Sequence, residues 1–222
     1  MKQFKTQVAE AAGWFADVAS RLSTRRDSAP ITTVEQLFEF ARTRASLIAQ
    51  KKLYGYLKER MGTSYPKMFE DEVFAKAIHI ATLHVFAASL SDMTVHAVAN
   101  AAMGSTLPAT GRRRMAVECF AAGIAANAEM VTEPEAPKQW RADFDARLAE
   151  VLWDSVAAGG HAFTQSPKAL IKWAPISDDY KKLDREIVEN SIRYAWNEVR
   201  EDFRKRLDAP AVVADWKMNE AD

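Results

Sequence analysis

The sequence predicts an all-α protein, a single helical domain over residues 1–222 with about six long helices arranged around one central apolar helix. Two observations predict this class. Apolar residues recur three and four positions apart through most of the chain, as they do along one face of a helix. Only 8 glycines and 8 prolines are present, which fits long helices joined by short connections and gives little indication of strands.

The composition narrows the class of protein and its expected surroundings. Hydrophobic residues make up 48% of the chain and charged residues 27%, and 30 Lys and Arg balance 30 Asp and Glu, as in a packed globular protein without a field that attracts nucleic acid. A single cysteine, Cys119, excludes an internal disulfide framework and a cysteine zinc cluster. No continuous apolar stretch typical of a signal peptide opens the chain, so we expect a cytoplasmic protein.

The first expected helix covers residues 1–22 and has one apolar face. Its apolar residues alternate at spacings of four and three, and they are Phe4, Val8, Ala11, Phe15, Val18 and Leu22. The polar face is not strongly basic, so a membrane surface is a poor partner. We expect this amphipathic helix to be mobile or to lie at an interface, against its own domain or a second subunit. Residues 23–31 follow as a loop.

The second expected helix extends from Val34 to Met61 and begins at a capping box formed by Thr32 and Glu35. One apolar stripe of this helix suits a core. A second stripe repeats every seven residues on nearly the opposite side and consists of Phe40, Leu47, Tyr54 and Met61. Either the helix lies between two layers of one core, or the second stripe contacts another molecule, which makes it a candidate interaction surface for a homodimer.

The central helix is expected from Pro66 to Met103. No Asp, Glu, Lys or Arg occurs between Ala77 and Ser91, a stretch shorter than the roughly 20 residues that cross a bilayer, so we expect no membrane span. Further helices follow around residues 115–130 and 140–155, after Pro167, and from Ser177 to about Leu207. The tail, residues 209–222, is expected to dock or to fray.

A narrow polar sector on the central helix is the strongest candidate site. At 100° per residue, five polar side chains fall within about 80°, and these are Thr82, Ser89, Asp92, His96 and Asn100. Asp92 and His96 are four residues apart, so the carboxylate can orient the imidazole as a general base or a metal ligand, and His161 could join them. Thr82, Ser89 and Asn100 would then line a ligand pocket. The alternative is that this sector is the helix's solvent-facing side.

Motifs that would identify a metal site or another reaction are lacking. His79 and His84 are five residues apart and project about 140° from each other, which is poor geometry for one metal. No Glu-x-x-His pair for a di-iron bundle occurs, so we predict no metal and no cofactor. We interpret His84 as a core or interface histidine and Cys119 as a buried structural thiol.

Two functions remain open from the sequence. The first is a non-enzymatic helical protein that binds another protein or a second copy of itself, as an adaptor, an assembly helper or a regulator. The second is a helical enzyme, or a protein that binds a small ligand or a metal, with a pocket around Asp92 and His96 and with Trp173 or Trp196 nearby. No nucleic-acid partner is expected in either case.

Overall fold

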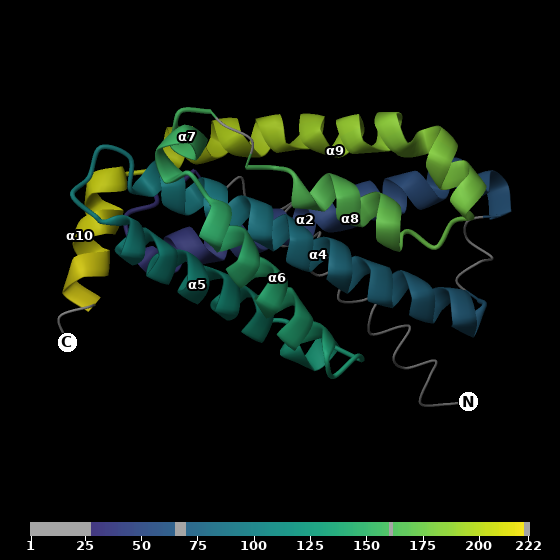
Figure 1. Cartoon of the computed structure of the whole chain (residues 1–222). Coiled ribbons are helices and arrows are strands. Elements are labelled where there is room, and N and C mark those ends of the chain that lie inside the picture. Colours follow the sequence, from purple (N-terminus) through teal and green to yellow (C-terminus); the bar gives the residue numbers. More distant parts are fainter. Residues whose placement is uncertain (1–27, 65–69, 160–161, 220–222) are drawn as a thin grey trace.

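The computed structural model describes residues 28–64, 70–159 and 162–219 (Figure 1). Within these ranges the chain forms eight α-helices and two short 3-10 helices, which confirms the all-α class. Six of the eight α-helices have 11 or more residues, and α7 and α8 are shorter. The described residues contain no strand, and the one β-type contact is an isolated bridge between Ile31 and Leu207. The amphipathic helix expected over residues 1–22 lies outside the described residues.

Helix α2, Val34–Met61, begins one residue later than its expected capping box indicates. Thr33 is the N-cap, its side chain accepts from the backbone N–H of Gln36, and the Gln36 side chain accepts from the backbone N–H of Thr33. Thr32 with Glu35 and Thr33 with Gln36 both satisfy the motif, because glutamine and glutamate can fill the same role. The helix ends at Gly62, whose φ of 53° is unfavourable for other residues.

Helix α4, Glu72–Ala101, is the central element, and it starts later than the expected Pro66. Asp71 caps it by accepting from the backbone N–H groups of Val73 and Phe74. Of its 30 residues, 19 are buried, mainly against α2, α5 and α8. By length and composition alone α4 could also cross a bilayer, and half of its most apolar window is buried inside the protein.

The remaining helices surround α2 and α4. They are α5 (Ala109–Ala125), α6 (Ala136–Glu150), α7 (Trp153–Ala157), α8 (Gln165–Trp173), α9 (Asp178–Arg206) and α10 (Ala209–Asn219). In Figure 1, α9 lies along one side of the bundle and α5 and α6 lie along the other, with α2 and α4 between them. The helix expected from Trp140 to Ser155 is divided at Val151 and Leu152, so that α6 and the short α7 take its place.

The two ends of the described chain are tied together. The backbone N–H of Ile31 donates to the carbonyl oxygen of Arg206 at 2.7 Å, and the backbone N–H of Asp208 donates to the carbonyl oxygen of Ile31 at 3.0 Å. The expected tail is helix α10, which docks through buried Val212, Val213 and Trp216.

Candidate functional site

The polar sector expected on the central helix is buried. Ser89 and Asp92 are fully inaccessible to solvent, Thr82 and His96 are 4% and 5% exposed, and Asn100 is half-buried. The alternative of a solvent-facing side therefore does not describe this sector. The Thr82 hydroxyl donates to the carbonyl oxygen of Ile78, a bond within its own helix.

Asp92 holds the start of α8 against α4. Its Oδ1 accepts from the backbone N–H groups of Thr164 and Gln165 at 3.2 and 3.1 Å, and its Oδ2 accepts from the backbone N–H and the hydroxyl of Ser166 at 2.8 and 2.6 Å. The Ser166 hydroxyl also accepts from the indole N–H of Trp196 at 3.0 Å. Asp92 thus supplies the N-terminal cap that α8 lacks within its own sequence.

Arg147 on α6 completes the surroundings of this carboxylate. Its Nη1 lies 2.8 Å from Asp92 Oδ1 and 2.7 Å from the Ser91 hydroxyl, and its Nη2 donates to the carbonyl oxygen of Ala162. Burial raises the pKa of Asp92, while Arg147 and the hydrogen bonds from Ser166 and Gln165 oppose that rise. Five donors face the two carboxylate oxygens, so this group is positioned to join three helices and not to accept a substrate proton.

His96 does not contact Asp92 in any hydrogen bond and instead packs among aromatic rings. Its ring centroid lies 5.1 Å from that of Phe163 and 5.6 Å from that of Phe203. Burial, together with the positive charges of Arg200 and Arg204, lowers the pKa of His96 to about 4. The imidazole is therefore neutral at pH 7, and its Nε2 has no hydrogen-bond partner among the described residues. His161, its expected companion, lies outside the described residues.

Asn100 and Ser89 take no part in a shared pocket with these groups. The Asn100 amide donates to the carbonyl oxygen of His96 at 2.8 Å, and the Ser89 hydroxyl has no hydrogen-bond partner among the described residues. The residues of the expected sector are thus brought together on one helix, but they do not line the groove described below.

The second stripe of α2, expected as an interaction surface, is largely covered by the protein itself. Phe40 is buried and its ring centroid lies 5.2 Å from that of Phe203 on α9, so it belongs to the core. Leu47, Tyr54 and Met61 are half-buried, and Tyr54 and Met61 pack against the core. Helix α2 therefore lies between α4 and α9, as the first of the two readings of its pattern requires.

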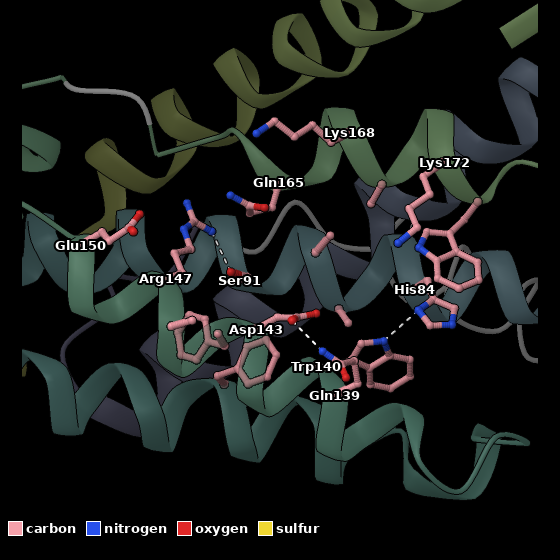
Figure 2. A pocket seen from close by; sticks show the side chains of 17 residues that line it. His84, Ser91, Gln139, Trp140, Asp143, Arg147, Glu150, Gln165, Lys168 and Lys172 are labelled. Carbon is pink, nitrogen blue, oxygen red and sulfur yellow. Dashed lines mark hydrogen bonds between the residues drawn. The ribbon is translucent and has the colours of Figure 1, made fainter.

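An open groove lies between α4, α6 and α8 and has a volume of about 650 Å³ (Figure 2). Helices α6 and α8 both pack against α4 and make few contacts with each other, which leaves the space between them open. Small side chains deepen it, and they are Ala87 and Ala88 of α4, Ala146 of α6 and Ala169 of α8. Phe120 and Phe144 add an apolar floor.

One end of the groove is aromatic. The His84 ring is stacked on the Trp173 ring with a centroid distance of 3.4 Å and an interplanar angle of 4°. The indole N–H of Trp140 donates to His84 Nδ1 at 2.9 Å, so the ring proton of neutral His84 sits on Nε2, which lies 3.1 Å from Glu133 Oε2. Burial lowers the pKa of His84, and Glu133 acts in the opposite direction. Both ring nitrogens are therefore occupied.

The two walls of the groove carry opposite charges. Helix α6 presents exposed Asp143 and Glu150, and helix α8 presents exposed Lys168 and Lys172. Figure 2 shows the two lysines on one side of the groove and Asp143 on the other. Asp143 accepts from the Gln139 amide at 2.8 Å, and the Lys172 ammonium lies 5.2 Å from the centre of the Trp173 ring. Apart from Arg147 of α6, which is paired with Asp92, a ligand in the groove would meet carboxylates along the α6 edge and ammonium groups along the α8 edge.

Sequence reasoning did not find this groove. Among its residues it singled out Trp173 as a possible neighbour of a pocket and His84 as a core or interface histidine. The sequence of α4 contains one indication of the groove: at helical spacing, Ala87, Ala88 and Ser91 form a patch of small residues beside His84. The walls come from two other helices, and nothing in their own periodicity indicates that they stay apart.

Metal-binding and homology comparisons complete the description of the site. Across residues 28–64, 70–159 and 162–219, no group of three or more His, Cys, Asp or Glu side chains is arranged to hold a metal ion. Comparison of the chain with protein-family models, curated proteins and solved structures found no match.

Proposed function

We propose that this chain is a binding protein that holds an extended segment of a partner protein in the groove between α4, α6 and α8. The observation that carries the proposal is the groove itself, which is partly open to solvent and is lined by alanines and phenylalanines among its other residues. Small-molecule sites normally enclose most of the ligand surface, whereas an open groove suits a chain that enters and leaves it.

The side chains around the groove support a peptide ligand. Tryptophan and arginine are the residues most enriched among the contacts that dominate binding energy, and Trp140, Trp173 and Arg147 line this groove. The hydrogen bonds that hold Trp140 and Arg147 in place reduce the entropy lost when a ligand contacts them. The charged walls would select the orientation of the bound segment more than its affinity.

The surroundings of the titratable groups also favour binding over proton-transfer chemistry. His84 is hydrogen-bonded through both ring nitrogens, and Asp92, behind the groove, is bound by five donors. A general base needs a free acceptor within reach of the proton that it removes. The groove offers aromatic faces, apolar side chains and charged rims, which are the contacts that a peptide uses.

Filling the groove should weaken peptide binding. Peptides of about twelve residues, selected from a random library displayed on phage, would be synthesised and titrated against the protein by following tryptophan fluorescence. In the variant Ala146→Arg a long charged side chain enters the groove, and we expect binding to weaken at least tenfold, about 1.4 kcal/mol. Circular dichroism would verify that the variant is folded, since Ala146 is exposed.

A matched control uses the same helix and the same substitution. Ala149 is also exposed on α6 but does not line the groove, so Ala149→Arg should weaken binding far less than Ala146→Arg does. Selected peptides that bind both variants as tightly as the unmodified protein would refute the groove as the binding site.

A further inference from the structure

A second cleft lies between α8 and the N-terminal part of α9, and it is strongly basic. Its volume is about 400 Å³, and Ile171 is the one apolar side chain among the described residues that line it. Five cations surround this cleft, which we call the basic cleft, and they are Lys168, Lys172, Lys181, Lys182 and Arg185. A chain whose charges balance overall therefore concentrates positive charge at one hollow.

The two carboxylates of the basic cleft leave most of this charge uncompensated. Glu189 accepts from Arg193 at 2.7 Å, so a cation that does not line the cleft neutralises it. Asp178 lies 3.7 Å from the Lys181 ammonium and is 88% exposed, which makes this pair weak. A concave site with a surplus of one sign of charge attracts a ligand of the opposite sign.

The two cations that are best placed for a ligand come from different helices. Lys168 of α8 and Arg185 of α9 are exposed, and neither forms a hydrogen bond or an ion pair with another residue in the part of the chain that the structure describes. A ligand can therefore bind both without first breaking an internal contact. An anion between them would also screen the repulsion between like charges.

Lys181 joins the two walls of the basic cleft. Its ammonium donates to the carbonyl oxygen of Lys172 at 3.2 Å, so a side chain of α9 is anchored to the last turn of α8. The Lys181 side chain is only 17% exposed. The positions of the walls are thus fixed before a ligand arrives, which reduces the entropy lost on binding.

The basic cleft adjoins the α4–α6–α8 groove. Lys168 and Lys172 line both hollows and form the ridge between them, since residues four apart lie on one face of a helix. Figure 2 shows these two lysines along one edge of the groove. A helix with its side chains is about 10–12 Å wide, and an extended chain covers about 3.3 Å per residue. Three or four residues therefore suffice to pass from the groove over α8 into the basic cleft.

We infer that the basic cleft binds acidic side chains of the same partner segment that occupies the groove. The segment then carries a short run of Asp or Glu three or four residues beyond the part held in the groove. This inference rests on the proposed function and names the chemistry of the partner. Several carboxylates along a chain suit these cations, because the cations are distributed over two helices instead of converging from one loop.

Binding of octaglutamate tests the basic cleft without the groove. The probe would be titrated calorimetrically at about 20 mM salt, where screening is weak. The double variant Lys168→Gln, Arg185→Gln replaces two exposed side chains, so the bundle should stay folded, as circular dichroism would verify. We expect its dissociation constant for octaglutamate to rise at least fivefold. The charge-conserving variant Lys168→Arg, Arg185→Lys should bind within about twofold of the unmodified protein.

The matched control removes the same two types of charge from another place on α9. Arg204 and Lys205 are exposed, do not line the basic cleft, and lie about 28 Å along the helix from Arg185. Arg204→Gln, Lys205→Gln should change the dissociation constant less than about twofold. Equal weakening in the two double variants would overturn the inference, because octaglutamate would then respond only to overall charge.

Two further probes distinguish other anionic ligands. Tripolyphosphate that binds more tightly than octaglutamate, and loses its binding in Lys168→Gln, Arg185→Gln, would assign the cleft to compact phosphates and overturn the acidic segment. Sedimentation with vesicles containing phosphatidylserine would do the same for a lipid surface, if the unmodified protein bound them and this double variant did not.

Extended peptides connect the basic cleft to the groove. A peptide selected for the groove would be lengthened by four glutamates at either end, with four glutamines as the control. We expect one glutamate extension to tighten binding at least fivefold in the unmodified protein and to give no gain in Lys168→Gln, Arg185→Gln. No gain at either end would overturn the inference while leaving the groove in place. If Ala146→Arg did not weaken the selected peptides but octaglutamate still required Lys168 and Arg185, the proposed function would fail and the acidic ligand of the cleft would stand.

Discussion

At the scale of single residues, His96 connects the packing of the protein to its pH dependence. Burial and the nearby charges of Arg200 and Arg204 lower its pKa from 6.5 to about 4, so the folded protein binds fewer protons at this site than the unfolded chain between these two values. Stability contributed by neutral His96 is therefore fully present above pH 6.5 and is lost as the pH falls toward 4. The size of the shift corresponds to about 3 kcal/mol.

Replacing this histidine should flatten the pH dependence of stability. In His96→Leu the residue no longer titrates, and the Asn100 amide keeps its bond to the backbone carbonyl of residue 96. Both proteins should lose stability between pH 7 and pH 4, as measured by urea denaturation. We expect the loss in free energy of unfolding to be about 3 kcal/mol smaller for His96→Leu than for the unmodified protein. His84 titrates in both proteins and cancels in the comparison. Identical dependence of unfolding free energy on pH in the two proteins would show that protonation of His96 does not destabilise the fold.

The polar sector of α4 shows what a helical wheel can and cannot predict at this scale. The wheel correctly grouped Asp92 and His96 with Thr82, Ser89 and Asn100, because all five lie on one helix of known period. It could not indicate what faces them. Asp92 meets the first backbone N–H groups of α8, which lie more than seventy positions along the sequence, and this partnership depends on tertiary packing.

At the scale of elements, the approach of α5 to α4 depends on a glycine. A Cβ atom at Gly123 would lie 2.6 Å from Cδ2 of Leu90, which is fully buried and has little room to move. We expect Gly123→Ala to lower the free energy of unfolding by about 1–3 kcal/mol through overpacking, although alanine is the better helix former.

Gly55 is the matched control for that prediction. It lies inside α2, is exposed, and a Cβ atom there would meet nothing within 4 Å. Gly55→Ala should therefore raise the free energy of unfolding by about 0.5–1 kcal/mol, as measured by urea denaturation of both variants. Two substitutions of the same type would then have opposite signs, and equal signs would show that helix propensity outweighs the contact between α4 and α5.

The helix boundaries show which local signals were decisive. Asp71 and Gly62 stand at ends of helices that capping rules can explain. The break at Val151 and Leu152 has no such residue, and the apolar repeat continues across it into Trp153. A prediction from periodicity therefore joins α6 and α7, whereas in the structure the separate α7 packs against α4.

At the scale of the whole molecule, the groove depends on two helices that both pack on α4 and make few contacts with each other. The patterns of α6 and α8 predict that each packs on a core, but they contain no information on the distance between the helices. The closure between the ends of the described chain is also non-local. Asp215 of α10 accepts from the backbone N–H of Val34 at 2.8 Å and so caps the start of α2.

This closure predicts that α10 unfolds together with the bundle. Trp216 is buried at the contact of α10 with α2 and α4, and its indole N–H has no hydrogen-bond partner among the described residues. Trp216→Ala should therefore cost about 3–5 kcal/mol in the free energy of unfolding, and Trp216→Phe less than about 1.5 kcal/mol. A chain ending at Asp208 should be destabilised at least as much as the alanine variant, with circular dichroism and tryptophan fluorescence reporting one transition. A helix that caps α2 and packs against α2 and α4 cannot be removed without weakening the bundle. If the shortened chain unfolded at the same urea concentration as the full chain, α10 would therefore be independent of the bundle.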